Sequence, residues 1–588
     1  MAATRCARLR RAGDRRYAAV MADRHHSLSS SIASLHGDEQ AVGQPLNDSE
    51  QIALGRTRVF GATGTVLMGI GALGAGARPV VQDPTFGVRL LNLPSRIQTV
   101  SLTMTTTGAV MMALAWLMLG RFALGKRRMS RGDLDRTLLL WVLPLLVAPP
   151  MYSKDVYSYL AQSQICWLGL DPYRVGPATG LGLGHVFTLS VPSLWRETPA
   201  PYGPLFLWIG RGISALTGEN IVAAVLCHRL VVLVGVGLIV WATPRLARRC
   251  GVAEVSALWL GAANPLLIMH LVAGIHNEAP MLGLMLTGTE FALRGVDSAR
   301  PLWPRPWPRA RGHWADWAPL GMLLVGAVLI VLSSQIKLPS LLALGFVTMA
   351  LAQRYGGTLR SLLLAGGLMS ALTLAVMAAV GSASRLGFGW IYTLGTANVV
   401  RSWMSPPTLI ALGTGQVGIL LGLGDHTTAV LSLTRGIGVL IIAVMVAWLL
   451  MAVLRGRLHP VGGLGVALGG TVLLFPVVQP WYLLWAIIPL AAWATRAGFR
   501  LAVIVVTLVV GIFGPTANGD RFALFQIVDA TVASTVIVPL LIAATYHRLP
   551  WRPLTDEEPK SDAADQNPPP TGPTPQPASL PGAYAESS

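Results

Sequence analysis

The stretch IGVLIIAVMVAWLLMAVL, residues Ile437–Leu454, has eighteen residues and no charged side chain. A helix that crosses a bilayer needs about 20 mostly apolar residues, and its backbone polar groups must bond within the helix because lipid offers no partner. The stretch therefore predicts a membrane-spanning helix. Comparable runs recur between Phe60 and Tyr546, among them Leu102–Leu119, Ile221–Ala242, Leu362–Val380 and Phe525–Tyr546.

The composition agrees with an all-α protein that crosses the membrane many times. Of the 588 residues, 53% are apolar and only 12% are charged, whereas a soluble domain has about 25% charged residues. A soluble globular protein is therefore excluded. The net charge of +18 does not predict nucleic-acid binding, because Lys and Arg fall in short clusters between apolar runs, as in cytoplasmic loops. The four cysteines, Cys6, Cys166, Cys227 and Cys250, lack metal-ligand spacing and predict no disulfide framework.

These basic clusters predict the orientation of the helices, because clusters on one side must be separated by an even number of crossings. That parity denies a crossing to residues 203–217 and 406–424, which are predicted to be re-entrant or interfacial helices on the outer face. About fourteen spans remain, within a range of roughly 13 to 15. The clusters are Lys126–Arg136, Arg245–Arg249, Arg300–Arg311, Arg354–Arg360, Arg455–Arg457, Arg496–Arg500 and Arg548–Arg552.

Three parts follow from this map. Residues 1–58 are predicted to be a cytoplasmic and mostly disordered tail, residues 59–546 the transmembrane domain, and residues 547–588 a Pro-rich, disordered cytoplasmic tail. The transmembrane domain is predicted to carry outer loops at 151–220 and 382–430 and a cytoplasmic linker at 295–318.

The first outer loop begins with a candidate catalytic acid. Pro149 and Pro150 are predicted to end the third helix, which places Asp155 just beyond the outer membrane boundary. If residues 153–164 are helical, Asp155 and Tyr159 share one face at i, i+4 spacing. A carboxylate in a half-dry interface has a raised pKa and suits a general base. The alternative, that Asp155 caps an interfacial helix, stays open.

Other candidates lie further along the chain. Asp171 and Tyr202 stand in loop segments rich in aromatic rings, Arg and acids, which suit sugar recognition but are equally typical of an interfacial belt. The turn Gly274–Pro280 brings together His276, Asn277 and Glu278, either as functional groups at membrane depth or as a polar cap on the next helix.

Three cations complete the set of candidates. Arg229 lies inside an apolar span, where an internal ion pair or a phosphate contact would explain it. Lys337 and Arg401 are predicted on the outer face, where each could bind a phosphate or simply extend to the surface.

Six strings together resemble one family. They are PPMYSKDVYSYLAQ (149–162), GLDPYRVGP (169–177), PAPYGPLFLWIGRGIS (199–214), ANPLLIMHLVAGIHNEA (263–279), LGTANVVRSWMSPP (394–407) and FPVVQPWYLLW (475–485). They resemble the MptA/MptB family of polyprenol-phosphomannose-dependent α-(1→6)-mannopyranosyltransferases, and most closely MptB of mycobacteria. The resemblance runs from about Ala33 to Leu554. Pro280 departs from the family pattern, but a proline is tolerated in the first turn of a helix.

The resemblance implies a GT-C glycosyltransferase in the plasma membrane, with its active site on the periplasmic face. Its donor would be polyprenyl-phosphate mannose and its acceptor the 6-hydroxyl of a lipid-anchored mannan, in the core of lipomannan and lipoarabinomannan. The resemblance makes Asp155 the catalytic base. Neither a metal nor another cofactor is expected. The phosphate would be held by His276 with one or more of Arg229, Lys337 and Arg401, and the sugar pocket would be formed by Asp171, Tyr202 and Glu278, with Tyr159 and Asn277 nearby.

Three other classes of function remain open. A flippase or transporter of lipid-linked sugars would concentrate its ionisable residues near the midplane of the membrane. A GT-C transferase of another sugar, such as arabinose, would share the fold and the catalytic acid. A non-catalytic scaffold would leave Asp155 replaceable.

Overall fold

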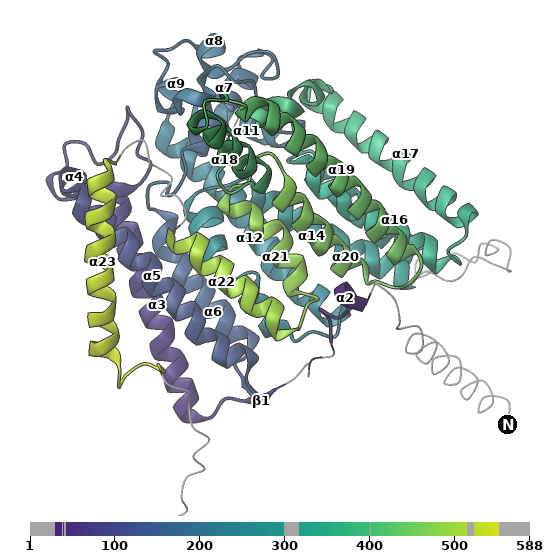
Figure 1. Ribbon diagram of the computed structural model, residues 1–588, viewed down its shortest axis with the longest axis horizontal. Helices are drawn as coiled ribbons and strands as arrows, with labels where there is room; N and C mark the ends of the chain where they lie inside the picture. Colours follow the sequence, from purple (N-terminus) through teal and green to yellow (C-terminus); the bar gives the residue numbers. More distant parts are fainter. Residues whose placement is uncertain are drawn as a thin grey trace, which may run out of the picture.

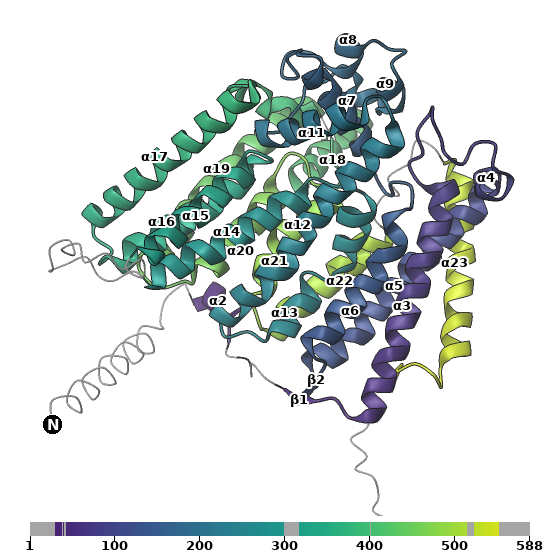
Figure 2. The ribbon, with the colours of Figure 1, turned by 180° about the vertical axis from the view of Figure 1, so that it is seen from behind.

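The computed structural model describes residues 30–37, 39, 43–298, 317–399, 401–513 and 522–551. These residues form a helical protein, as predicted (Figures 1 and 2). The strands among them are β1 (Gln44–Pro45) and β2 (Arg127–Arg128), which pair in parallel. Most of both predicted tails, and residues 299–316 of the predicted linker, lie outside the described residues.

Six of the described helices are long and apolar enough to cross a bilayer, which confirms a multi-pass membrane protein. Each apolar run named above falls within one of them, Ile437–Leu454 within α19, apart from Tyr546, which directly follows α23. The six are α3 (Asp48–Ala75), α5 (Gln98–Leu124), α12 (Ile221–Arg249), α17 (Leu359–Ser384), α19 (Thr427–Leu454) and α23 (Leu524–Thr545).

Prolines interrupt several of the other apolar segments. Pro144 starts a 3₁₀ turn, η1 (Leu143–Leu146), directly after α6 (Arg131–Val142). The predicted end of the third helix at Pro149–Pro150 is therefore wrong, because the earlier proline already removes a backbone N–H from the helix. The resulting apolar helices have 10–17 residues, fewer than the roughly 20 that a bilayer-spanning helix needs. Helix length and composition alone therefore do not give the predicted count of about fourteen spans.

The remaining helices of the described part are mostly short. They are α2 (Ser30–Ala33), α4 (Arg89–Arg96), α7 (Asp155–Trp167), α8 (Pro177–Leu181), α9 (Val186–Ser190), α10 (Ser193–Arg196), α11 (Pro204–Thr217), α13 (Glu254–Leu260), η2 (Leu267–Ala273), α14 (Glu278–Ser298), α15 (Ala318–Ser334), η4 (Leu338–Leu341), α16 (Leu342–Arg354), η5 (Gly389–Val399), α18 (Pro406–Leu420), α20 (Pro460–Leu474), η6 (Pro480–Tyr482), α21 (Leu483–Ala491) and α22 (Ala497–Phe513).

The first long helix starts earlier than the predicted boundary at residue 59. Helix α3 begins at Asp48, where Asn47 and Glu50 form a reciprocal capping box. Each side chain satisfies a backbone N–H that the first helical turn leaves without a partner. The local capping signal therefore extends the helix back into the segment predicted as a tail.

Several predicted cytoplasmic clusters meet at one end of the molecule. The carboxylate of Glu39 forms ion pairs with Arg128 at 3.2 Å and with Arg500 at 2.9 Å, and the Glu39 amide donates to the carbonyl of Gly251. Segments far apart in the sequence thus converge near β1 and α2. Helices α7, α8, α9 and α11 gather at the opposite end (Figures 1 and 2).

Glycines allow the helices that carry the site to approach closely. A Cβ atom on Gly283 of α14 would lie 2.5 Å from the carbonyl oxygen of Gly235 in α12. At the outer end, a Cβ atom on Gly210 of α11 would lie 2.0 Å from Oγ of Ser163 in α7. Small residues at such crossings let two helix backbones pack tightly. This packing matters in a membrane, where the hydrophobic effect contributes little to the association of helices. These contacts set the positions of α7 and α14.

Candidate active site

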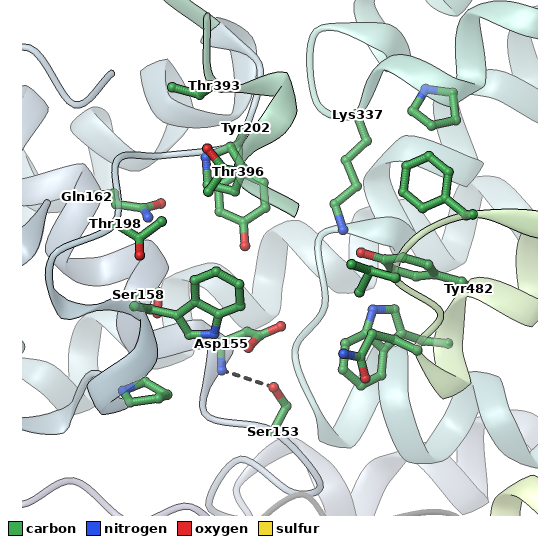
Figure 3. Close-up of a pocket in the computed structure, with 18 of the residues that line it drawn as sticks. Ser153, Asp155, Ser158, Gln162, Thr198, Tyr202, Lys337, Thr393, Thr396 and Tyr482 are labelled. Carbon is green, nitrogen blue, oxygen red and sulfur yellow. Dashed lines mark hydrogen bonds between the residues drawn. The ribbon is translucent and has the colours of Figure 1, made fainter. Parts of the chain in front are cut away.

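A cavity of about 480 Å³ lies at the end of the molecule that carries α7. Its walls come from the start of α7, the loop at 192–202, the turn at 337–339, η5 and the segment 475–485. In Figure 3 the carboxylate of Asp155 points into this space, and the side chains of Lys337 and Tyr482 enter it from the opposite wall. The cavity therefore brings together residues separated by more than 300 positions in the sequence.

A strained turn positions Asp155. Tyr152 has a φ of 62°, a left-handed conformation that is unfavourable for a bulky side chain. The amide of Met151 holds the turn by donating to the carbonyl of Ala273 at 2.9 Å. The amide of Asp155 then donates to Oγ of Ser153 at 3.0 Å, at the point where α7 begins. The side chain of Asp155 keeps 27% of its surface exposed, in the cavity.

A second strained turn brings His276 close to the acid. Ile275 has a φ of 58° between η2, a π-helix, and α14. Nδ1 of the fully buried His276 lies 3.7 Å from Oδ2 of Asp155, and its ring stacks on Trp481 with the centroids 3.6 Å apart. Burial, with His270 and Lys337 nearby, lowers the pKa of His276 well below its ordinary value. His276 is therefore neutral and adds no positive charge beside Asp155.

A buried ion pair fixes the cation of the cavity. Nζ of Lys337 contacts Oε1 of Glu278, whose side chain has no exposed surface. The ammonium also lies over the ring of Tyr482, 4.9 Å from its centroid, and 5.7 Å from that of Tyr202. Burial alone would lower the pKa of Lys337, but Glu278 and Tyr482 raise it above its ordinary value. Lys337 therefore stays an ammonium.

These surroundings also tune Asp155. Burial raises the pKa of Asp155 to about 6, an effect that Lys337 opposes and Glu278 reinforces. A carboxylate with a pKa near the working pH is ionised yet still basic enough to accept a proton, which is the condition for a general base. The site therefore offers a base on one wall and a fixed cation on the other.

Two family models match this chain. The model of the MptA/MptB family, described as alpha-(1->6)-mannopyranosyltransferase, N-terminal domain, matches residues 58–353, and the model of the MptB C-terminal domain matches residues 407–543. The chain belongs to the MptA/MptB family. It is thus a membrane glycosyltransferase, and the resemblance seen in the six strings is confirmed.

Individual relatives agree with the family models. A probable alpha-(1->6)-mannopyranosyltransferase of Mycolicibacterium smegmatis is 77% identical over 97% of this chain and 100% of its own length. An alpha-(1->6)-mannopyranosyltransferase of Mycobacterium tuberculosis is 77% identical over 96% of this chain and 100% of its own length. The alpha-(1->6)-mannopyranosyltransferase B of Corynebacterium glutamicum is 40% identical over 76% of this chain and 74% of its own length.

In this MptA/MptB member, the residues of α7 that line the cavity differ from the predicted pair. Asp155, Ser158 and Gln162 line it, at i, i+3, i+7 spacing. Tyr159 does not, because its ring packs against Tyr202 and Phe206 in edge-to-face contacts at 5.2 and 5.0 Å. The helical period of 3.6 residues would have identified Ser158 and Gln162 from the sequence.

Three other candidates lie outside the cavity lining. Asp171 pairs with Arg174 at 3.3 Å and accepts a hydrogen bond from the amide of Tyr173. Arg401 is exposed. Arg229 is 2% exposed and donates to the carbonyls of Leu146 and Ala148, so it holds the chain that leads to Asp155. These contacts give Asp171 and Arg229 local structural roles.

The other predicted residues lie at or beside the cavity of this MptA/MptB member. Tyr202 and Lys337 line it, and the buried Asn277 lies between His276 and Glu278 in the turn before α14. Sequence reasoning missed Lys154, Trp481 and Tyr482 as lining residues. Among the described residues there is no group of three or more His, Cys, Asp and Glu side chains with metal-site geometry.

Proposed function

We propose that this chain is an inverting GT-C mannosyltransferase. It moves mannose from polyprenyl-phosphate mannose to the 6-hydroxyl of a lipid-anchored mannan and thereby builds the α-(1→6)-mannan core of lipomannan and lipoarabinomannan. The observation that carries the proposal is the cavity in which Asp155, with its pKa raised to about 6, faces the ammonium of Lys337. The names of the relatives, both alpha-(1->6)-mannopyranosyltransferases, support the linkage and the sugar.

The proposed reaction is a single displacement. The acceptor oxygen bonds to the anomeric carbon of mannose as the bond from that carbon to the phosphate oxygen breaks. The proton of the acceptor hydroxyl passes to the carboxylate of Asp155, and polyprenyl phosphate leaves with the electron pair of the broken bond. A β-linked donor then yields an α-linked product. Phosphate is already a good leaving group, so one base suffices, where an inverting hydrolase needs an acid and a base.

The geometry suits this displacement because the nucleophile and the leaving group must lie on opposite sides of the reacting carbon. Asp155 comes from α7, and Lys337 enters from the opposite wall (Figure 3). Lys337 is held by Glu278 and needs little reorganisation as charge develops on the phosphate, which is how a preorganised site lowers the barrier. We assign the phosphate to Lys337. His276, predicted from the sequence to hold the phosphate as well, is neutral and gives the phosphate no charge. The scheme uses no metal and no other cofactor.

The proposal places the cavity on the periplasmic face of the plasma membrane, in a chain of about fourteen spans. The basic residues linked through Glu39 lie at the end of the molecule opposite α7. Lys and Arg are concentrated in cytoplasmic loops of membrane proteins. A periplasmic cavity also meets a lipid-linked donor at the membrane edge.

The test is transfer by the purified full-length chain in lipid vesicles. Radiolabelled polyprenyl-phosphate mannose is supplied with a short α-(1→6)-mannoside, and the linkage of the product is determined by methylation analysis. We expect α-(1→6) extension with or without EDTA, and none with a polyprenyl-phosphate arabinose donor. Movement of the donor across the vesicle without transfer would identify a flippase, and loss of transfer with EDTA would overturn the metal-free scheme.

The proposed base predicts how the rate depends on pH. Because only ionised Asp155 accepts a proton, kcat/KM should fall about tenfold per pH unit below pH 6, where its pKa lies. The profile is measured in vesicles at saturating donor. As a control, enzyme exposed to low pH is returned to neutrality and assayed again, which separates titration from inactivation. A flat profile between pH 5 and pH 7 would contradict the role of Asp155.

A further inference from the structure

Two polar side chains on the cavity face of α7 each have an oxygen atom without a hydrogen-bond partner among the described residues. Ser158 is 4% and Gln162 is 3% exposed, and both line the cavity. Oγ of Ser158 and Oε1 of Gln162 make no hydrogen bond with any described residue. A buried polar group without a partner costs about 1–3 kcal/mol. Two such groups, one helical turn apart and both facing a cavity, indicate a ligand that supplies the missing hydrogen bonds.

The neighbouring wall adds neutral hydrogen-bond acceptors. The hydroxyls of Thr198 and Thr393 donate to the carbonyls of Leu194 at 2.9 Å and Trp390 at 3.0 Å, so their lone pairs remain available to a ligand. Figure 3 shows Gln162, Thr198 and Thr393 on the side of Asp155, away from Lys337 and Tyr482. Trp195 also lines the cavity and offers an aromatic ring.

The lining of the cavity contains both cations and neutral hydrogen-bonding groups. The cations among its lining residues are Lys337, on the far wall, and Lys154, at the N-cap of α7. Ser158, Gln162, Thr198 and Thr393 are neutral. Hydroxyl and amide groups beside an aromatic ring suit the hydroxyls of a sugar, whereas a phosphate needs the charge that Lys337 supplies.

The residues of α7 that line the cavity form a row that leads away from Asp155. Residues 155, 158 and 162 follow one helix face, so Gln162 lies about 10 Å along the helix from the base. A carbohydrate acceptor continues beyond the hydroxyl that reacts, and this row continues beyond Asp155. We propose that Ser158 and Gln162, with Thr198 and Thr393, form the subsite for the acceptor carbohydrate, an inference that rests on the proposed function. The donor phosphate takes the side that contains Lys337.

The test compares Ser158→Ala, Gln162→Ala and the double variant in the vesicle assay, with donor and acceptor concentrations varied separately. We expect the KM for the α-(1→6)-mannoside to rise about fivefold to tenfold in each single variant, since a lost hydrogen bond is worth about 1 kcal/mol. The KM for the donor should stay constant. The matched control is Gln164→Ala: Gln164 is also buried in α7 with an unpartnered Oε1, but it does not line the cavity. Both KM values should be unchanged in this control.

Direct binding keeps the test independent of turnover and of folding. The thermal midpoint of each variant is measured first. Binding of the α-(1→6)-mannoside is then followed by saturation-transfer NMR, in a background that carries Asp155→Asn. Weaker binding in the Ser158 and Gln162 variants supports the acceptor subsite. A rise in donor KM equal to that for the acceptor, or unchanged binding and KM, overturns it. The proposed function itself fails only if the wild-type chain transfers no mannose.

Discussion

Replacing Asp155 by asparagine is expected to lower kcat by about 10² to 10⁴, the usual contribution of a general base. The side chain of asparagine has the same size as that of aspartate, and the backbone amide at position 155 still donates to Oγ of Ser153. The side-chain amide, however, cannot take a proton from the acceptor hydroxyl. The KM for the donor should change little, because the proposal places the phosphate on the side of Lys337. Single-turnover transfer from labelled donor, in vesicles, measures the effect. Full activity in this variant would remove Asp155 from the mechanism.

The same variant should be more stable than the wild type. The pKa of Asp155 is raised to about 6 in the folded protein, so the folded state holds this proton more tightly than the unfolded chain does. Ionisation of Asp155 therefore lowers the stability of the fold as the pH rises from about 4 to 6, and the full cost remains, without further change, above pH 6. The Asp155→Asn variant avoids this cost, and its thermal midpoint near neutrality should be higher. The matched control is Asp171→Asn, at an acid outside the cavity, which should leave the rate unchanged. It should shift the midpoint little, because its pair with Arg174 is exposed to solvent.

Replacing Lys337 by methionine is expected to lower kcat by about 10² to 10³, the size of effect seen when one preorganised electrostatic contact is removed. The loss should exceed that from replacement of any other cation proposed for the phosphate, because Lys337 alone among Arg229, Lys337 and Arg401 lines the cavity. Initial rates at saturating donor and acceptor measure it. The matched control is Arg401→Gln, which removes an exposed cation that does not line the cavity. This variant should retain activity.

Stability must be separated from catalysis in this second experiment. Loss of Lys337 leaves Glu278 buried without its partner, and breaking a buried pair costs about 3–5 kcal/mol. The double variant Lys337→Met with Glu278→Gln removes both charges and should recover most of the lost stability. Activity should stay low, since the variant lacks Lys337, the cation that the proposal assigns to the phosphate. Recovery of the rate together with stability would show that Lys337 is a structural residue only.

Several features of this chain followed from local sequence. Ile437–Leu454 lies within a long helix because its length and lack of charge are sufficient to predict one, whatever surrounds it. The basic residues predicted to share one side, such as Arg128 and Arg500, do meet at one end. The candidate turn at 274–280 also follows from a short string, because its residues are neighbours in the chain.

The composition of the cavity needed the tertiary structure. From the sequence, three cations were equally good candidates for binding the phosphate. Only packing decides that Lys337 enters the cavity while Arg229 donates to the carbonyls of Leu146 and Ala148. Packing against α11 also fixes the rotation of α7 about its axis. The ring of Tyr159 packs on Phe206 of α11, so that Ser158 and Gln162 face the cavity.

The division has one physical reason. Hydrophobic length, charge clusters and an acid that follows a pair of prolines are properties of contiguous residues, so the sequence alone determined a polytopic helical protein with Asp155 as its leading acid. The pKa of Asp155 depends on Lys337 and Glu278, and the stacking of His276 depends on Trp481, which lies 205 positions away. Contacts across such distances exist only after the helices have packed, so the tertiary structure alone decided which residues surround Asp155.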